Sequence, residues 1–142
     1  MSRKRSKARH YAVQALYQWQ MTGQDIADID RQFLSEQDLN SFEVPFFRDL
    51  LRGVPTHLTE LDEHLASCLD RAIESVDPVE RAILRLGAFE LLHHPEIPYR
   101  VAINEAVELA KMFGAEQGHR YVNGVLDKLA RSIRPTEARK NR

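Results

Sequence analysis

The 142-residue chain lacks the features that mark several protein classes. Its single cysteine, Cys68, leaves no internal disulfide to staple the fold, which suits a reducing compartment. No apolar run approaches the roughly 20 residues that a membrane span needs. The basic N-terminus is not followed by the apolar segment of a secretory signal. We therefore expect a single cytoplasmic domain that folds around an ordinary hydrophobic core.

The sequence also lacks the motifs that carry most enzyme chemistry. It contains no glycine-rich phosphate loop, and no serine, histidine and acid can be singled out as a catalytic set. His64 and Cys68 are four residues apart and could share one face of a helix, but two ligands do not make a zinc site. Cys68 also continues an apolar stripe. We therefore expect no catalytic site, no metal site and no cofactor.

The net charge of -1 conceals an uneven distribution. Residues 1–9 and 131–142 together hold 10 of the 20 lysines and arginines, but only 1 of the 21 acidic residues. Residues 10–130 keep the other 10 basic residues and 20 acidic ones. Basic ends attract phosphate, which makes nucleic acid a natural partner, whereas an acidic body suits a basic protein. Alternatively, the basic ends only keep the chain soluble.

Helical periodicity dominates the chain, and no segment alternates as a strand would. We expect helices near residues 7–21, 26–36, 42–50, 58–76, 78–92, 103–113 and 121–133. Gly23 should end the first helix, and Gly53 and Pro55 should interrupt the third pattern. The connections are short, which favours antiparallel neighbours. The sequence thus predicts an all-α, compact domain over 1–142 with six to seven helices in two small bundles, divided near Val76.

The strongest helix start is Asp77-Pro78-Val79-Glu80. The Asp77 side chain can accept hydrogen bonds from the first turn, Pro78 suits the first helical position, and Glu80 resembles the second partner of a capping box. The helix that follows is apolar around most of its circumference, so it should be central. At the two ends of the domain, we expect a basic arm at residues 1–9 and a flexible basic tail at residues 135–142.

Several segments, in one order along the chain, resemble the NusB family. They are residues 12–17 (AVQALY) with Trp19, 79–86 (VERAILRL) with 89–91 (FEL), 98–111 (PYRVAINEAVELAK), 113–114 (FG) and 121–127 (YVNGVLD). The resemblance spans nearly the whole chain and implies an all-helical fold of two small bundles. It also implies that the protein binds boxA, a short single-stranded RNA signal in ribosomal-operon and phage transcripts, together with NusE, a protein of the small ribosomal subunit. The pair would help to assemble an antitermination complex on RNA polymerase.

An RNA surface follows from the resemblance together with the residue types. Cations hold the phosphates of single-stranded RNA, and planar side chains stack on its bases. Family members often carry an acid at the position of Gln117, where this chain has an uncharged amide. From spacing alone, Tyr17, Phe113 and Tyr121 could equally be core residues. The expected RNA contacts are Arg3, Lys4, Arg5, Lys7, Arg9, Gln14, Tyr17, Gln18, Lys111, Phe113, Gln117 and Tyr121.

A second face, around the predicted central helix, is a candidate for binding NusE. Its acids could pair with a basic ribosomal protein, and such charge complementarity mainly sets association rate and register. The alternative is a solvated surface around a helix cap. The residues of this expected face are Glu74, Asp77, Glu80, Arg81, Arg85 and Glu90.

Two further interpretations remain open at this point. NusB-like domains also occur at the N-terminus of certain ribosomal RNA cytosine methyltransferases, but this chain ends at Arg142 and would be such an enzyme only if truncated. The other interpretation is a helical bundle that forms a homodimer through its apolar helices and covers the RNA face. A size measurement with and without RNA separates the homodimer from the RNA-binding adaptor.

Overall fold

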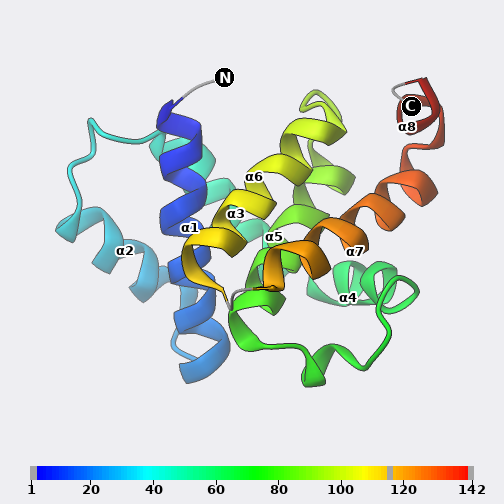
Figure 1. Ribbon diagram of the computed structural model, residues 1–142. Coiled ribbons are helices and arrows are strands. Elements are labelled where there is room, and N and C mark those ends of the chain that lie inside the picture. The colour runs from blue at the N-terminus through cyan, green and yellow to red at the C-terminus, as the bar shows by residue number, and fades with distance from the viewer. Residues whose placement is uncertain (1–2, 115–116, 141–142) are drawn as a thin grey trace.

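The computed structural model describes residues 3–114 and 117–140, and within these ranges it is all-helical and contains no strand (Figure 1). The helices are α1 (Arg3–Thr22), α2 (Ile26–Glu36), α3 (Val44–Thr56), α4 (Leu58–Ala66), α5 (Pro78–His93), α6 (Tyr99–Phe113), α7 (Gly118–Ile133) and α8 (Pro135–Lys140). A short 3-10 turn, Ile73–Ser75, precedes α5. The predicted all-α class is confirmed, and no helix of the described residues has the length and apolarity that crossing a membrane requires.

Helix α5 lies at the centre, as its apolar circumference predicts. It packs against α1, α3, α4, α6 and α7, and every residue from Ala82 to Leu91 is buried. The Asp77 carboxylate accepts hydrogen bonds from the backbone N–H groups of Val79 and Glu80 at 3.1 and 3.2 Å. Pro78 occupies the first turn, where a missing N–H is harmless. The local sequence therefore specifies where this core helix begins.

The other helices form two groups around α5, but they divide earlier than Val76. Helices α1, α2 and α3 pack together on one side, and α4, α6 and α7 lie on the other (Figure 1). The predicted helix over residues 58–76 is wrong beyond Ala66, because the chain leaves α4 there and reaches α5 through turns. Cys68 and Val76 are nevertheless buried, which explains why the apolar spacing continues past the end of the helix.

Two glycines show opposite relations to their helices. Gly23 has φ +69° and ends α1, as predicted, since glycine adopts this left-handed conformation without steric cost. Gly53 does not interrupt a helix; it lies inside α3 together with Pro55. A Cβ at Gly53 would collide with the ring of Phe89 on α5, so this position lets α3 approach the central helix closely.

The described residues near both ends of the chain are helical. Helix α1 begins at Arg3, so residues 3–9 of the predicted arm are helical; residues 1–2 and 141–142 lie outside the described residues. Residues 135–140 of the predicted tail form α8, with Ala138 buried. Just before it, the Arg134 guanidinium donates to the backbone carbonyls of Glu90, Leu91, His94 and Ile97. These bonds hold the end of the chain against the C-terminal end of α5.

Candidate nucleic-acid interface

Helix α1 presents one face to the core and another to a surface cleft. Ala12, Ala15 and Leu16 are buried, whereas Tyr17, one residue further on, leaves 38% of its surface exposed. Gln14 lies three residues before Tyr17 and four before Gln18, so it neighbours both on the helix surface, although Tyr17 and Gln18 themselves diverge. Tyr17 is therefore a surface residue, which decides the alternative that spacing left open.

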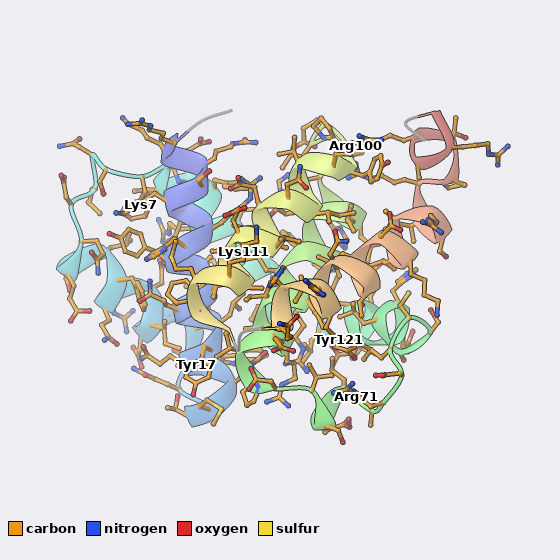
Figure 2. All side chains as sticks on the ribbon, in the orientation of Figure 1. Lys7, Tyr17, Arg71, Arg100, Lys111 and Tyr121 are labelled. Carbon is orange, nitrogen blue, oxygen red and sulfur yellow. The ribbon has the colours of Figure 1, made fainter. Side chains whose placement is uncertain are left out.

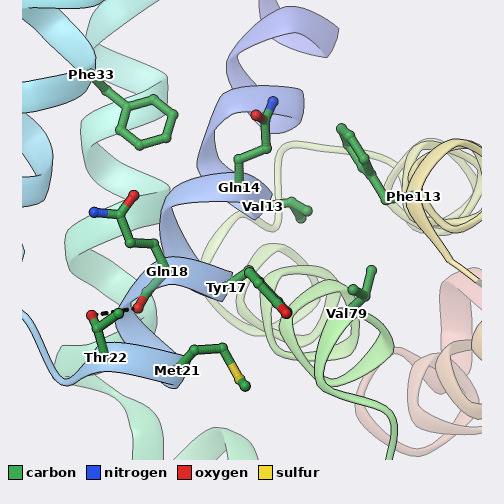
Figure 3. Close-up of a pocket in the computed structure, with 9 residues that line it drawn as sticks. All are labelled: Val13, Gln14, Tyr17, Gln18, Met21, Thr22, Phe33, Val79 and Phe113. Atoms are coloured by element: carbon green, nitrogen blue, oxygen red, sulfur yellow. Dashed lines mark hydrogen bonds between the residues drawn. The ribbon is translucent and has the colours of Figure 1, made fainter.

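The cleft has a volume of about 550 Å³ and brings together residues from four helices (Figure 3). Figure 3 shows Gln18 and Phe33 on one side of α1, and Tyr17, Val79 and Phe113 on the other. Four of the expected RNA contacts, Gln14, Tyr17, Gln18 and Phe113, thus meet in one hollow. The full lining is Val13, Gln14, Tyr17, Gln18, Met21, Thr22, Phe33, Val79 and Phe113. Exposed aromatic and amide groups in such a hollow can stack on bases and bond their edges.

The amides in the cleft are held by hydrogen bonds. Gln14 Nε2 donates to the backbone carbonyl of His10 at 3.3 Å. Gln18 Nε2 lies 2.7 Å from Gln24 Oε1 and 3.0 Å from Gln32 Oε1. Because these bonds engage the NH₂ groups, the orientation of each amide is defined before a ligand arrives.

A second groove, of about 440 Å³, runs between the N-terminal half of α1 and α6. Arg3 and Lys7, both exposed, line it together with His10. The His10 ring lies 4.9 Å from the ring of Phe113, a residue of the first cleft, so this contact joins the two hollows. His10 was not expected from the sequence. Burial, and then the nearby charge of Lys7, lower the pKa of His10, so its ring is neutral in the free protein near pH 7.

Arg9 is a wrong prediction as an RNA contact. Its side chain is 2% exposed, and its guanidinium donates two hydrogen bonds to the Glu90 carboxylate, at 2.8 and 2.7 Å. A third bond, at 3.1 Å, reaches Glu105. Arg5 points the same way: it contacts Glu43 at 3.3 Å and lies over the Phe46 ring. Arg9 is therefore committed to the fold, and Arg5, whose side chain is 35% exposed, contacts the protein on one side; Arg3, Lys4 and Lys7 are exposed to solvent.

The remaining expected RNA contacts lie apart from the cleft. In the view of Figure 2, Lys111 on α6 lies above both Tyr17 on α1 and Tyr121 on α7. Lys111 is exposed, and its Nζ lies 3.5 Å from Glu108 Oε1. Gln117 is exposed at the start of α7. Neither belongs to the linings of the two hollows.

Tyr121 forms a cluster with the segment that follows α4. Its hydroxyl donates to Asp70 Oδ1 at 3.1 Å, and the Arg71 guanidinium lies 4.7 Å from its ring centroid. Burial, and then the hydrogen bond to Asp70, raise the pKa of the Tyr121 hydroxyl. Arg71 was missed from the sequence, because nothing local places it near a residue 50 positions later. Any contact of Tyr121 with RNA would involve this cluster.

Half of the residues expected to form the protein-binding face are buried, namely Glu80, Arg85 and Glu90. Glu90 is fully buried against Arg9, and Arg85 makes a two-bond pair with Asp62 at 3.0 and 2.9 Å. The Glu80 carboxylate lies under the first turn of α7, where burial raises its pKa. These three residues are therefore structural, and their inclusion in a solvent-exposed face is wrong.

Three members of that face remain accessible. Glu74 and Asp77 are exposed, although the Asp77 carboxylate already caps α5. Arg81 is partly buried, and one of its nitrogens donates to the backbone carbonyl of Glu74 at 3.4 Å. Asp77 and Arg81 lie at the start of α5, and Glu74 lies in the 3-10 turn just before it. Among the described residues, neither hollow holds a cluster of potential metal ligands.

Sequence comparison places this geometry among known proteins. The chain matches the model of the NusB family over residues 6–131. The transcription antitermination protein NusB of Nitrosococcus oceani is 62% identical over 139 residues, which cover 98% of this chain and 93% of that protein. The protein of the same name from Pectobacterium carotovorum is 56% identical over 130 residues, covering 92% and 94%.

Solved structures agree. NusB of T. maritima has a TM-score of 0.83 at 28% identity and covers 99% of both chains. A structure of the antitermination factors NusB and NusE in complex with dsRNA also gives 0.83, at 26% identity, covering 93% of this chain and 99% of that one. Fold and sequence thus define a small, all-helical protein of transcription antitermination, in a class without catalytic activity. The chain belongs to the NusB family of transcription antitermination proteins.

Proposed function

We propose that this protein binds boxA single-stranded RNA together with NusE and helps to assemble the antitermination complex on RNA polymerase, including in ribosomal RNA operons. The observation that carries the proposal is the junction of the two hollows on α1. Tyr17 and Phe113 offer rings for stacking in the first, and Arg3 and Lys7 offer cations in the second. Stacking platforms beside cations are the usual means of holding single-stranded RNA. Glu105 and Glu108 also line the second groove, on its α6 side, so the cations available to phosphate are those of α1. The assembly would take place in the cytoplasm.

The solved complex of NusB and NusE with dsRNA supports the choice of partners. In that complex the RNA is a duplex, whereas the hollows here suit unpaired bases that can enter a cleft. The proposed contacts of this chain are therefore Arg3, Lys4, Lys7, Gln14, Tyr17, Gln18 and Phe113, with Lys111, Gln117 and Tyr121 along the strand beyond. Glu74, Asp77 and Arg81 remain the proposed contacts for a basic protein partner.

The test is fluorescence anisotropy of a labelled boxA RNA titrated with the protein, with and without NusE. A scrambled strand and a duplex of the same length serve as competitors. We expect tighter binding to boxA than to either competitor, and a further gain when NusE is present. Absent binding, or equal binding to all three RNAs even with NusE, would contradict the proposal.

Two substitutions assign the contacts. Tyr17→Ala should weaken binding by about 1–3 kcal/mol if the ring stacks on a base. Leu39→Ala is its control, since Leu39 is 48% exposed outside both hollows. Lys7→Glu should weaken binding and flatten its salt dependence, because each phosphate contact contributes roughly 0.7 to the slope. Lys128→Glu reverses an equally exposed charge on α7 and should leave both quantities unchanged.

A homodimer would use the same cleft, because Tyr17 and Met21 expose apolar surface there, at 38% and 54%. Light scattering coupled to size exclusion, with and without RNA, measures the mass of the species that forms. If a dimer exists, RNA should dissociate it, since both occupy one surface. A dimer that persists when RNA is bound would place its interface elsewhere.

A further inference from the structure

Away from the RNA hollows, three potential metal ligands from two distant parts of the chain converge. His57 joins the end of α3 to the start of α4, Glu60 lies in the first turn of α4, and His93 is the last residue of α5. One atom from each lies within 4.8 Å of the others, and no other such group of three occurs in the described residues. His64 and Cys68, the pair noticed in the sequence, are not part of it.

The two histidines lie at different distances from the Glu60 carboxylate. His93 Nε2 lies 2.7 Å from Glu60 Oε1, which is a hydrogen bond. His57 Nδ1 lies 3.7 Å from the same oxygen, which is too far for one. The two imidazole rings lie 4.1 Å apart between centroids and are tilted by 30°. Two ring nitrogens thus face one carboxylate oxygen that satisfies only one of them well.

We propose that His57, Glu60 and His93 form a binding site for a divalent transition-metal ion, with Zn²⁺ as the best match. Zn²⁺ binds imidazole nitrogen and carboxylate oxygen at about 2.0–2.2 Å, so ligand atoms around a tetrahedral ion lie roughly 3.3 Å apart. The two distances to Glu60 Oε1 lie on either side of that value. Small side-chain rotations would therefore bring all three atoms to one ion.

The surroundings suit an ion with an open coordination position. The Phe89 ring, itself 3% exposed, stacks on His93 at 5.1 Å and lies 6.0 Å from His57. This apolar ring limits the access of water to the side of the cluster that faces the core, which strengthens the bonds to the ion. On the other side, the His57, Glu60 and His93 side chains are 40%, 45% and 29% exposed. Water could therefore complete the coordination, as at other zinc sites with three protein ligands.

Such an ion would link the junction of α3 and α4 to the end of the central helix. His57 marks the boundary between α3 and α4, which belong to different groups, and His93 ends the central helix. An ion bound only in the folded state stabilises that state in proportion to the logarithm of its concentration above the dissociation constant. The inference does not rest on the proposed RNA binding, because none of the three residues lines either hollow.

The test uses the full chain without a histidine tag, titrated with Co²⁺ and with Zn²⁺. Co²⁺ bound to these ligands should give visible absorption bands that saturate at one ion per chain and are abolished by competing Zn²⁺. Zn²⁺ should raise the melting temperature. His57→Ala and Glu60→Gln change side chains that are 40% and 45% exposed, and each should weaken metal binding at least about tenfold.

His119→Ala is the matched control, because this histidine is on α7, outside the cluster. It should leave both the absorption bands and the Zn²⁺-dependent melting shift unchanged. The proposal is overturned if Co²⁺ gives no saturable bands, or if His57→Ala and Glu60→Gln bind as tightly as the unchanged protein. Equal weakening by all three substitutions would also overturn it, since it would indicate scattered surface binding. His57, Glu60 and His93 would then be an ion pair with a neighbouring histidine.

Discussion

Replacing Arg9 by methionine should destabilise the protein strongly without directly removing an RNA contact. The substitution keeps an unbranched side chain but deletes both hydrogen bonds to Glu90 and the one to Glu105. Glu90 is 0% exposed, so its carboxylate would stay buried without a partner. Breaking one side of a buried ion pair costs about 3–5 kcal/mol. For a chain of this size, the melting temperature should fall by roughly 10–15 °C.

The pH dependence of that loss gives an independent check. Burial already raises the pKa of Glu90, and the hydrogen bonds and charge of Arg9 oppose that rise most, ahead of the charge of His94. Without Arg9, the folded-state pKa should rise further above the unfolded value, so folding favours the protonated acid. Below the unfolded-state pKa, Glu90 is protonated in both states and costs the folded protein nothing. As pH rises through the folded-state pKa, the free energy of unfolding falls, because the buried carboxylate must then carry a charge. The variant should therefore lie closest to the unchanged protein in mild acid and furthest from it above neutrality.

Urea denaturation measures both effects, and two further variants complete the experiment. Arg9→Met combined with Glu90→Met removes both charges and should recover much of the lost free energy, because an apolar pair can replace a buried ion pair. Lys4→Met makes the same replacement at an exposed cation and should change stability by no more than about 0.5 kcal/mol. If Arg9→Met left stability intact and weakened RNA binding, the buried pair would be the wrong description of Arg9.

Two other predictions follow from packing and from charge. Gly53→Ala should destabilise the protein by about 1–3 kcal/mol, because its Cβ has no room against the aromatic ring beneath it. Gly124→Ala, on an open helix face, should instead stabilise by up to about 1 kcal/mol in the same urea assay. Burial alone would lower the pKa of His94, but hydrogen bonds to Glu96 and Asp49 raise it above 6.5. The contribution of protonated His94 to stability is therefore lost as pH rises through the raised pKa. His94→Gln should make the melting temperature depend less on pH near neutrality.

What the sequence predicted well depended on local signals. The start of α5 follows from Asp77 and Pro78, and the end of α1 from Gly23, because caps act over one helical turn. The bounds of α2 were predicted as residues 26–36 and are confirmed. Reliance on local signals also explains why the helix predicted over residues 58–76 ran past the end of α4 at Ala66. No glycine or proline separates Ala66 from Val76, and buried residues keep the helical spacing after the helix has ended.

What the sequence could not give were the partners of residues far apart in the chain. Arg9 and Glu90 are 81 positions apart, and the surplus of acids in the body does not reveal which of them is buried. The cleft shows the same limit. Helical spacing predicts that Gln14, Tyr17 and Gln18 share a face, but Phe33, Val79 and Phe113 reach it from three other helices. His57 and His93 meet for the same reason, through the packing of α4 on α5.

The basic segment at the N-terminus shows how one structural fact changes the reading of a charge cluster. Once α1 extends back to Arg3, residues four apart share a face. Arg3 and Lys7 then line the groove, whereas Arg5 and Arg9 both lie over the Phe46 ring, at 4.4 and 5.0 Å. Helical phase therefore separates cations available to phosphate from cations used by the fold. A disordered arm would have left all of its cations free to contact RNA, whereas a helix presents to RNA only the cations on its exposed side.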